Sequence, residues 1–387
     1  MTVKEASQKW SVTPRRIGEY IREDRIDGAY KIGSAWVMPD DTQKPLNDKP
    51  GRKIKQASFT YIDLFAGIGG FHQAANSLGG KCLFACEIDP HAQRAYEANY
   101  GIVPYGDIAT LNAAIVPDHD VLLAGFPCQA FSICGNMKGF DDTRGTLFFD
   151  VARILKEKKP KMCVLENVKQ LSTHDGGNTL KTILKTLRDL GYSTHWRVLN
   201  ALDYGLPQKR ERTIIVGFHE VDVLFDFPKP TGAGDLKDIL DPDDVVEPRF
   251  FASEHIQSRR RSMHTPKITP SIWHENKAGN ISSYPYSCAL RAGASYNYLL
   301  VNGVRRPTLR ELLRLQGFPD TFEIVCNDSQ TRKQAGNAVP VNVIKSVLQE
   351  VLRAWKDHGC ETNRGRGSLN YTHWDKSPNA ISLKSGG

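Results

Sequence analysis

The chain has 387 residues, 40% hydrophobic and 24% charged, which is ordinary for a globular protein of two or three domains. No apolar run is long enough for a membrane span, and the N-terminus lacks a signal-peptide core, so we expect a cytoplasmic protein. The net charge of +8 suits a polyanionic partner such as nucleic acid, and eight cysteines without a C-x-x-C pair argue against disulfides, zinc or another metal site.

Residues 1–42 are predicted to form a small separate domain. Residues 3–10 suit a short helix, and Thr13-Pro14 gives the N-cap and first position of a second helix ending near Asp24. Residues 30–37 then suggest a tight hairpin. Two helices and a hairpin resemble a winged helix-turn-helix of the MerR/excisionase type, which would bind operator DNA; a capping or dimerisation module is the alternative. Its candidate DNA contacts are Arg15 and Arg16.

A basic linker is expected at 43–57, and strands then alternate with helices. The predicted strands span residues 61–65, 82–86, 121–124, 162–165 and 213–217. Such alternation predicts an α/β fold, a mostly parallel sheet with helices on both faces. We expect a first catalytic part at 58–217, an inserted domain at 218–304, a second catalytic part at 305–359 and a flexible tail at 360–387. The second catalytic part is expected to contain amphipathic helices at 309–315 and 341–355.

Two strand ends carry reactive side chains. Cys128 lies one step beyond the strand at 121–124, after a proline that fixes the backbone, so its thiol is presented rather than packed. Glu166 follows the strand at 162–165 in the same way. Because ligands bind at the carboxyl ends of strands in open α/β sheets, we expect the thiol and the carboxylate to share one site.

A glycine-rich turn follows the first strand of this region. Residues 63–71 (Asp-Leu-Phe-Ala-Gly-Ile-Gly-Gly-Phe) allow a ligand to approach the backbone, although they do not match the dinucleotide-binding fingerprint. Glu87 ends the second strand about 20 residues further on, where an acid can hold ribose hydroxyls. Asp107 ends a third segment, and a solvated surface role is the alternative for each acid.

These motifs, in their order and spacing, resemble the DNA (cytosine-5) methyltransferase family of bacterial type II restriction–modification systems. The resemblance covers residues 61–343 apart from the insert and rests on segments 63–71, 87, 106–108, 125–132, 166–168, 208–212, 306–319 and 336–340. It implies a Rossmann-like fold that uses S-adenosylmethionine and releases S-adenosylhomocysteine, with a target-recognition domain at 218–304.

The resemblance also implies the cofactor contacts. Phe65 would stack on the adenine, Glu87 would bind the ribose, and Asn337 with Val339 would close the pocket. The full set of implied cofactor residues is Phe65, Ala66, Gly67, Gly69, Gly70, Glu87, Ile88, Asp107, Ile108, Pro127, Leu147, Asn337 and Val339.

The implied chemistry suits the residue types. Carbon-5 of cytosine is a poor nucleophile, and a Cys128 thiolate adding to carbon-6 would activate it. Glu166, kept partly protonated by burial, would hydrogen-bond the ring N3 and the exocyclic amine. Arg210 would hold the base oxygen O2. Arg212 would support that arrangement or Glu166, and the alternative for Arg212 is a purely structural ion pair.

The target base must leave the duplex to be reached. Residues 129–149, with three glycines, suit a loop that closes over it, and Cys134 stands where relatives use a small polar side chain. Base reading is expected at 274–281 and 291–298, and phosphate contacts at 259–261. Many members of the family carry a Thr-Leu pair near the point where this chain has Ala289-Leu290. The candidate DNA contacts are Gln129, Ser132, Cys134, Arg144, Arg259, Arg260, Arg261, Asn276, Lys277, Arg291, Tyr296 and Asn297.

Three functions remain open at this stage. The leading one is methylation of a short duplex DNA site, with a restriction endonuclease as genetic partner and added transcriptional autoregulation. The second is methylation of cytosine in transfer RNA, against which the N-terminal domain argues because helix-turn-helix modules bind duplex DNA. The third is a transcription regulator, against which the intact Cys128, Glu166 and Arg210 argue.

Overall fold

The computed structural model describes residues 58–127 and 147–361 and, before them, residues 1–10, 17–18, 20–21, 26, 29–32, 35–39 and 42. It divides into two compact units, Met1–Ser58 and Phe59–Gly387. The predicted linker at 43–57 and the predicted tail from residue 362 onward lie outside the described residues.

The first unit has a small hydrophobic core of its own. Helix α1 (Val3–Trp10) buries Ala6 and Trp10, and strands β1 (Tyr30–Ile32) and β2 (Ala35–Val37) pair antiparallel as predicted. The other buried residues of this core are Ile17, Tyr20, Ile21, Ile26 and Met38. The predicted turn between the two helices, with Arg15 and Arg16, lies outside the described residues, so the helix-turn-helix stays a prediction.

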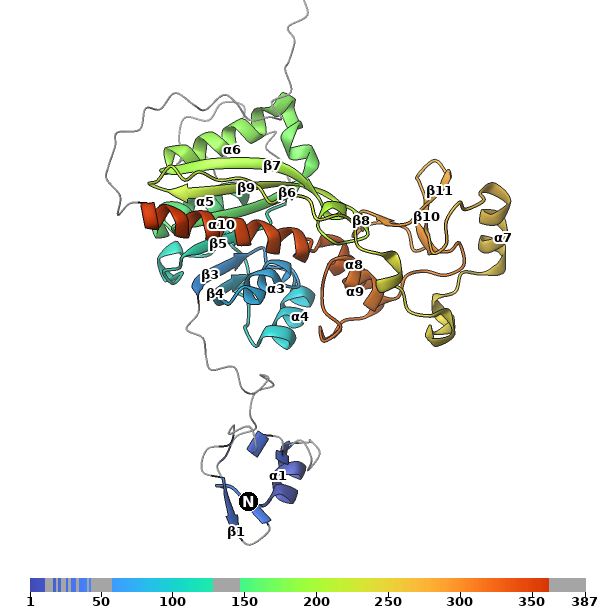
Figure 1. Cartoon of the computed structure of the whole chain (residues 1–387), viewed down its shortest axis with the longest axis horizontal. Helices are drawn as coiled ribbons and strands as arrows, with labels where there is room; N and C mark the ends of the chain where they lie inside the picture. The colour runs from blue at the N-terminus through green and yellow to red at the C-terminus, as the bar shows by residue number, and fades with distance from the viewer. Residues whose placement is uncertain are drawn as a thin grey trace, which may run out of the picture. The chain divides into compact units, whose positions relative to one another are not determined.

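A six-stranded sheet forms the centre of the second unit, in the order β4-β3-β5-β6-β9-β7 (Figure 1). The strands are β3 (Phe59–Leu64), β4 (Gly80–Cys86), β5 (Val121–Ala124), β6 (Met162–Val168), β7 (Tyr192–Asn200) and β9 (Glu211–His219). Only β9 runs against the others, because it pairs antiparallel with both β6 and β7. The predicted mostly parallel sheet is confirmed.

Strand β7 was not predicted. It lies at the edge of the sheet, and most of its residues are only half buried. Polar residues therefore interrupt the apolar run that marks the central strands.

Helices cover both faces of the sheet (Figure 1). In β5, Val121 and Leu123 face one core, and Leu122 and Ala124 face the other, because successive side chains of a strand point to opposite faces. The first core includes residues of α3 (Gly70–Ser77) and α10 (Val341–Glu361), and the second includes residues of α5 (Leu147–Lys158) and α6 (Asn178–Asp189). Helix α4 (Pro90–Tyr100) follows β4.

A lobe at one end of the sheet is built mainly from the insert at 218–304 (Figure 1). It contains α7 (Glu254–Met263) and a three-stranded sheet of β10 (Ile272–Glu275), β11 (Ile281–Tyr284) and β13 (Leu299–Val301). Strand β12 (Ser287–Cys288) pairs with β8 (Gln208–Lys209) of the catalytic part. We call residues 248–304 the insert lobe.

Two further helices join the lobe to the sheet. Helix α8 (Leu309–Leu315) matches its prediction and begins with a capping box between Thr308 and Glu311. The fully buried Glu311 also pairs with Arg305 at 2.9 Å, which fixes α8 to the end of the lobe. Helix α9 (Asp328–Asn337) was not predicted, because its polar sequence lacks an apolar stripe. Within the described ranges, no helix has the length and apolarity to cross a bilayer.

Candidate active site

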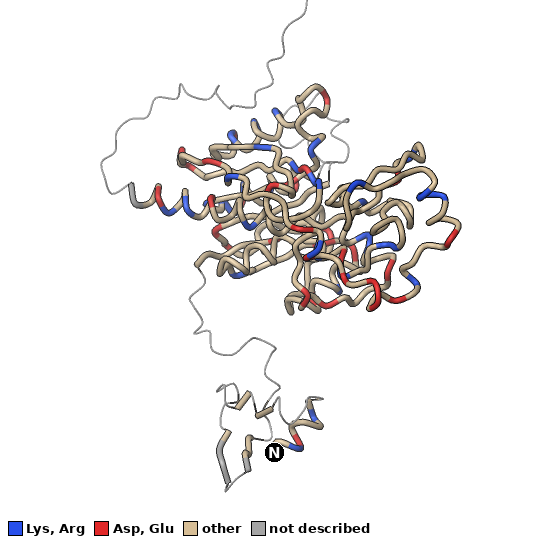
Figure 2. The backbone as a smooth tube through the Cα atoms, turned by 45° about the vertical axis from the view of Figure 1, so that its right-hand side comes forward, with Lys and Arg blue, Asp and Glu red and all other residues tan. Residues whose placement is uncertain are grey.

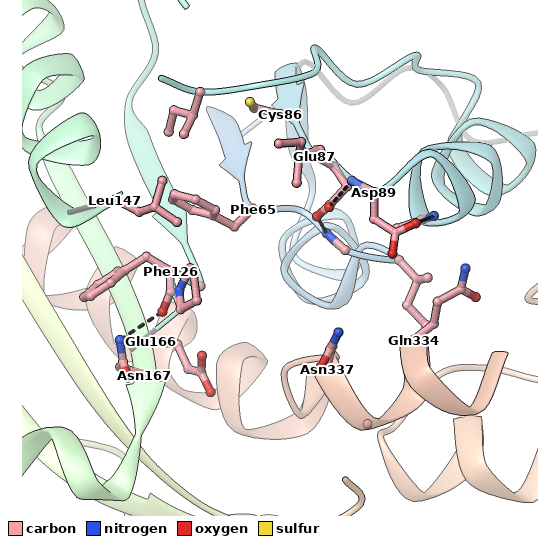
Figure 3. A pocket seen from close by; sticks show the side chains of 18 of the residues that line it. Phe65, Cys86, Glu87, Asp89, Phe126, Leu147, Glu166, Asn167, Gln334 and Asn337 are labelled. Atoms are coloured by element: carbon pink, nitrogen blue, oxygen red, sulfur yellow. Dashed lines mark hydrogen bonds between the residues drawn. The ribbon is translucent and has the colours of Figure 1, made fainter. Parts of the chain in front are cut away.

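A cavity of about 610 Å³ opens at the carboxyl ends of β3, β4, β5 and β6 (Figure 3). The ends of parallel strands meet at one edge of a sheet, which is why residues far apart in sequence converge here. Helix α9 supplies the facing wall through Lys333, Gln334, Gly336 and Asn337. Among the described residues, no cluster of three His, Cys, Asp or Glu side chains is placed to hold a metal ion.

The glycine-rich turn and Glu87 form one hydrogen-bonded unit. Phe65 and Gly67 both have φ of 56°, a left-handed conformation that bends the chain away from β3. The turned Gly67 N–H donates to Glu87 Oε2 at 2.7 Å, and Asp89 N–H donates to Glu87 Oε1 at 2.8 Å. Each carboxylate oxygen keeps a further lone pair for a ligand hydroxyl.

Nine of the thirteen predicted cofactor residues line the cavity. They are Phe65, Gly67, Glu87, Ile88, Asp107, Ile108, Pro127, Leu147 and Asn337. The other four, Ala66, Gly69, Gly70 and Val339, are not among the lining residues.

The packing around Gly69 and Gly70 gives a structural reason for glycine at both positions, and their predicted contact with the cofactor stays a prediction. A Cβ on Gly69 would lie 2.2 Å from the Tyr100 ring, and a Cβ on Gly70 would lie 2.6 Å from Val339 Cγ2. These glycines therefore permit close packing of α3 against α4 and the segment after α9. Of the three glycines in this turn, Gly67 alone leaves open space toward a ligand, because nothing lies within 4 Å of the position that a Cβ would take there.

Glu166 lies within the paired part of β6 rather than after the strand, opposite Ile214 of β9. Its Oε1 accepts from Arg212 Nε at 2.8 Å. Burial raises the pKa of Glu166, and the charges of Arg212 and Arg210 oppose that rise without cancelling it. The carboxyl group therefore keeps its proton to a higher pH than an exposed glutamate.

Arg210 joins three separate parts of the chain. Its Nη1 donates to Leu290 O at 3.1 Å, and its Nη2 donates to Gly336 O at 3.1 Å and Ala338 O at 2.7 Å. Burial and the neighbouring Arg212 lower the pKa of Arg210 to about 9, so the group stays charged at neutral pH. Only its buried Nε lacks a partner. The predicted contact with a base oxygen stays a prediction.

Asn167 positions the segment that leads to Cys128. Its side-chain amide donates to Phe126 O at 2.9 Å, as drawn in Figure 3. This bond fixes the end of β6 against the residues that follow β5. Cys128 itself, with Gln129, Ser132, Cys134 and Arg144, lies outside the described residues.

Five lining residues outside the predicted motifs were missed by the sequence analysis: Cys86, Asp89, Ala92, Lys333 and Gln334. The position of Asp89 at the start of a helix was predictable from the sequence, because Asp-Pro is a typical N-cap followed by the first helical residue. Lys333 and Gln334 had no comparable signal, since they lie on the unpredicted helix α9.

We expect Gly336→Ala to destabilise the protein. A Cβ there would lie 2.5 Å from Ala292 N and 2.8 Å from Arg291 C, and these main-chain atoms have no easy way to move. The expected loss is about 1–3 kcal/mol in the free energy of unfolding, measured in urea. Gly359→Ala, in open space on α10, is the matched control and should be neutral or stabilising. Equal effects of the two changes would contradict the packing argument.

The three arginines of α7 that were predicted to bind phosphate differ in how far they are buried. Arg260 is fully buried, and its Nη2 pairs with Glu275 Oε2 at 2.9 Å. The prediction that Arg260 contacts phosphate is therefore wrong; α7 turns this position toward the β10–β13 sheet. Arg259 also pairs with Glu275 but is 43% exposed, and Arg261 is exposed. Figure 2 shows Lys and Arg positions interspersed with Asp and Glu positions along the backbone of the second unit.

The predicted base-reading residues lie in two places. Asn276 and Lys277 form the turn between β10 and β11, where the Asn276 side chain accepts from Ala278 N and Asn280 N. Tyr296 is 45% exposed between the guanidinium groups of Arg306 and Arg332, at 4.4 and 4.3 Å from its ring centre.

The side chains near Tyr296 differ in whether they already bond another protein group. Asn297 Oδ1 accepts from Arg306 Nη1 at 3.0 Å, so that amide oxygen already has a protein partner. The Arg291 side chain is exposed and packs over the Tyr298 ring at 5.0 Å. The exposed candidates here are therefore Arg291 and Tyr296.

Comparisons with known proteins agree with this geometry. Residues 59–353 match the family model described as C-5 cytosine-specific DNA methylase. The chain is 56% identical over 296 residues to the type II methyltransferase M.HaeII of Haemophilus aegyptius, covering 76% of this chain and 92% of the relative. It is 55% identical over 287 residues to M.NgoBI of Neisseria gonorrhoeae, covering 74% and 90%. A solved structure of a putative DNA modification methyltransferase from an Escherichia coli prophage matches with a TM-score of 0.59 at 21% identity, over 77% and 100%, and shows the shared fold.

An α/β sheet with a ligand cavity at its strand ends and a buried, arginine-paired carboxyl group is typical of an enzyme active site. The chain belongs to the C-5 cytosine-specific DNA methylase family and is a DNA cytosine-5 methyltransferase.

Proposed function

We propose that the chain is the modification enzyme of a restriction–modification system, which methylates one cytosine within a short duplex sequence using S-adenosylmethionine. The observation that carries the proposal is the convergence of the Glu87-held turn and the Arg212-paired Glu166 on one cavity. The printed descriptions of M.HaeII and M.NgoBI as type II methyltransferases support the biological role.

The cavity residues fit S-adenosylmethionine. Gly67 leaves the space that a ligand needs to approach the backbone, and Glu87 offers carboxylate oxygens for ribose hydroxyls. Phe65 and Leu147 offer apolar surface for an adenine ring, with Asp107 and Ile108 beside it. Asn337 of α9 would close the pocket. The cofactor, when bound, supplies an electrophilic methyl group.

Two residues would activate the target base. The Cys128 thiolate would form a bond to carbon-6 of cytosine, which places electron density on carbon-5. Protonated Glu166 would donate to ring N3 and so stabilise the negative charge that the addition creates. After methyl transfer, loss of the carbon-5 proton and breakage of the bond to Cys128 would restore the aromatic ring.

The arginines would act by positioning. Arg212 holds one oxygen of Glu166, which leaves the other oxygen for the base. Arg210 would hold the insert lobe and α9 at the cavity through its three main-chain contacts. Its Nε has no partner in the protein and would bind the base oxygen O2.

Access to cytosine requires the base to flip out of the duplex. The loop predicted at 129–149, whose last three residues belong to α5, is proposed to close over the flipped base, with Gln129, Ser132, Cys134 and Arg144 as contacts. Sequence reading is proposed for the insert lobe, through Arg291, Tyr296, Asn297, Asn276 and Lys277.

A methyl-transfer assay tests this proposal. Purified protein would be incubated with S-adenosylmethionine carrying a labelled methyl group and with unmethylated duplex DNA, single-stranded DNA or transfer RNA. We expect label in duplex DNA, as 5-methylcytosine. Label confined to transfer RNA would replace the proposed substrate, and no label in any nucleic acid would refute the activity.

The N-terminal unit is proposed to be a winged helix-turn-helix that binds operator DNA of the same genetic system. That system would also contain the gene of a partner endonuclease. Helix α1, the hairpin and the unit's own core support a separately organised module. Footprinting on the upstream promoter with the full chain and with a chain lacking residues 1–57 tests this. Equal footprints would contradict it.

The division among the α7 arginines gives a second prediction. Arg259→Gln and Arg261→Gln together should flatten the salt dependence of DNA binding, by roughly one unit of slope for each phosphate that is no longer neutralised. Arg260→Ala should instead lower the free energy of unfolding by about 2–5 kcal/mol, because it leaves a cavity where a fully buried side chain had packed and bonded Glu275 and the Asn297 carbonyl. The measurements are binding titrations at several salt concentrations and urea unfolding. A normal fold with a flattened salt slope for Arg260→Ala would contradict the assignment.

A further inference from the structure

An ion pair bridges the two walls of the cavity. Lys333 Nζ of α9 lies 2.7 Å from Asp89 Oδ2, at the start of α4, and both residues line the cavity. The Lys333 and Asp89 side chains are 47% and 23% exposed. The pair therefore lies near solvent, where the contact is able to open and close.

Asp89 connects this ion pair to the turn that would hold the cofactor. Its Oδ1 caps α4 by accepting from His91 N at 2.9 Å, which leaves Oδ2 for Lys333. Its main-chain N–H donates to Glu87 Oε1, and Glu87 Oε2 accepts from Gly67 N. A continuous series of contacts thus runs from α9 through Glu87 to the glycine-rich turn; Figure 3 shows Asp89 and Glu87 side by side.

Other contacts also join the segment before α9 to α4. Asn99 exchanges two hydrogen bonds with the main chain of Glu323, at 2.7 and 3.0 Å, and Cys326 Sγ donates to His91 O. None of these four residues lines the cavity. All of these contacts are between uncharged groups, so a salt-dependent step at the cavity belongs to the Asp89–Lys333 pair rather than to them.

We propose that Asp89 and Lys333 form a clasp across the cofactor cavity that sets how long the cofactor stays bound. The inference rests on the proposed use of S-adenosylmethionine. Both are positioning residues: Asp89 orients Glu87, and Lys333 holds α9 against the cavity. A partly exposed ion pair is weak enough to open in each catalytic cycle, which suits an enzyme that must release its product S-adenosylhomocysteine.

The test measures release of S-adenosylhomocysteine by stopped-flow displacement. Lys333→Met keeps the alkyl stem, and Asp89→Asn keeps an oxygen to cap α4. Each is expected to speed release roughly two- to fivefold, the range for a partly exposed pair. The double variant should be no faster than either single one. Raising the salt concentration should speed release from wild type but have less effect on the double variant.

The control removes a comparable ion pair elsewhere. Lys161→Met breaks the 2.9 Å ion pair between Lys161 and Asp120, which is also in the second unit. Neither Lys161 nor Asp120 lines the cavity. The release rate of Lys161→Met should equal that of wild type. Wild-type rates for Lys333→Met, or additive effects in the double variant, would overturn the clasp. Failure of wild type to bind S-adenosylhomocysteine would instead refute the proposed function, and the clasp with it.

Discussion

Cys128→Ser is expected to abolish methyl transfer, with a rate loss of roughly 10⁴-fold or more. A serine hydroxyl stays protonated at neutral pH and is a far weaker nucleophile than a thiolate, so carbon-5 of cytosine would not be activated. The measurement is single-turnover transfer of labelled methyl from S-adenosylmethionine to duplex DNA, after gel-filtration and circular-dichroism checks that the variant is folded.

Two companion variants make this result specific. Cys326→Ser removes another free cysteine but keeps an atom that donates to His91 O, and it should retain wild-type transfer. Cys128→Gly should also be inactive yet still bind DNA tightly, because steric conflict with the flipped base is removed. Retained methyl transfer by Cys128→Ser would contradict the covalent mechanism.

Glu166→Gln is expected to lower the rate of transfer by about 10²- to 10⁴-fold. Glutamine still donates a hydrogen bond, but it has no acidic proton to share with ring N3. Burial raises the pKa of Glu166, so the proton is present at low pH and is lost as the pH rises through that raised value. The wild-type rate should therefore fall on the alkaline side, and this fall should be absent from Glu166→Gln. A pH–rate profile under single-turnover conditions provides the measurement.

Glu350→Gln provides the control, because it changes a glutamate that pairs with Arg353 on α10, outside the cavity. Its rate and pH profile should match wild type. Cofactor binding by Glu166→Gln should also remain, since Glu87 rather than Glu166 is assigned to the cofactor. A Glu166→Gln rate within threefold of wild type would remove Glu166 from the mechanism.

The central strands and the residues at their ends were accessible from the sequence. Strand β5 matches its predicted limits because all four of its residues are buried, which gives an uninterrupted apolar run. Phe65, Glu87 and Glu166 were found for a related reason: each lies at or just beyond a recognisable strand. In contrast, the edge strand β7 and the polar helix α9 carry no such run, so Lys333 and Gln334 were missed.

Local sequence also failed to show which side chains turn inward. Three consecutive arginines on α7 look alike in the sequence, but the helical repeat places only Arg260 against the lobe core beside Glu275. The sequence likewise shows no sign that Gly69 and Gly70 allow close packing by Tyr100 and Val339. In both cases the distant segments that set burial are not contained in the local pattern.

Methylation mapping tests the central claim most directly. The chain would be expressed in a bacterial host that lacks DNA methylation, and the host DNA would be sequenced with single-base detection of 5-methylcytosine. The account predicts one short motif modified at nearly every copy, and loss of that signal with Cys128→Ser. Unmodified DNA, from protein shown to be folded and to bind S-adenosylmethionine, would contradict it.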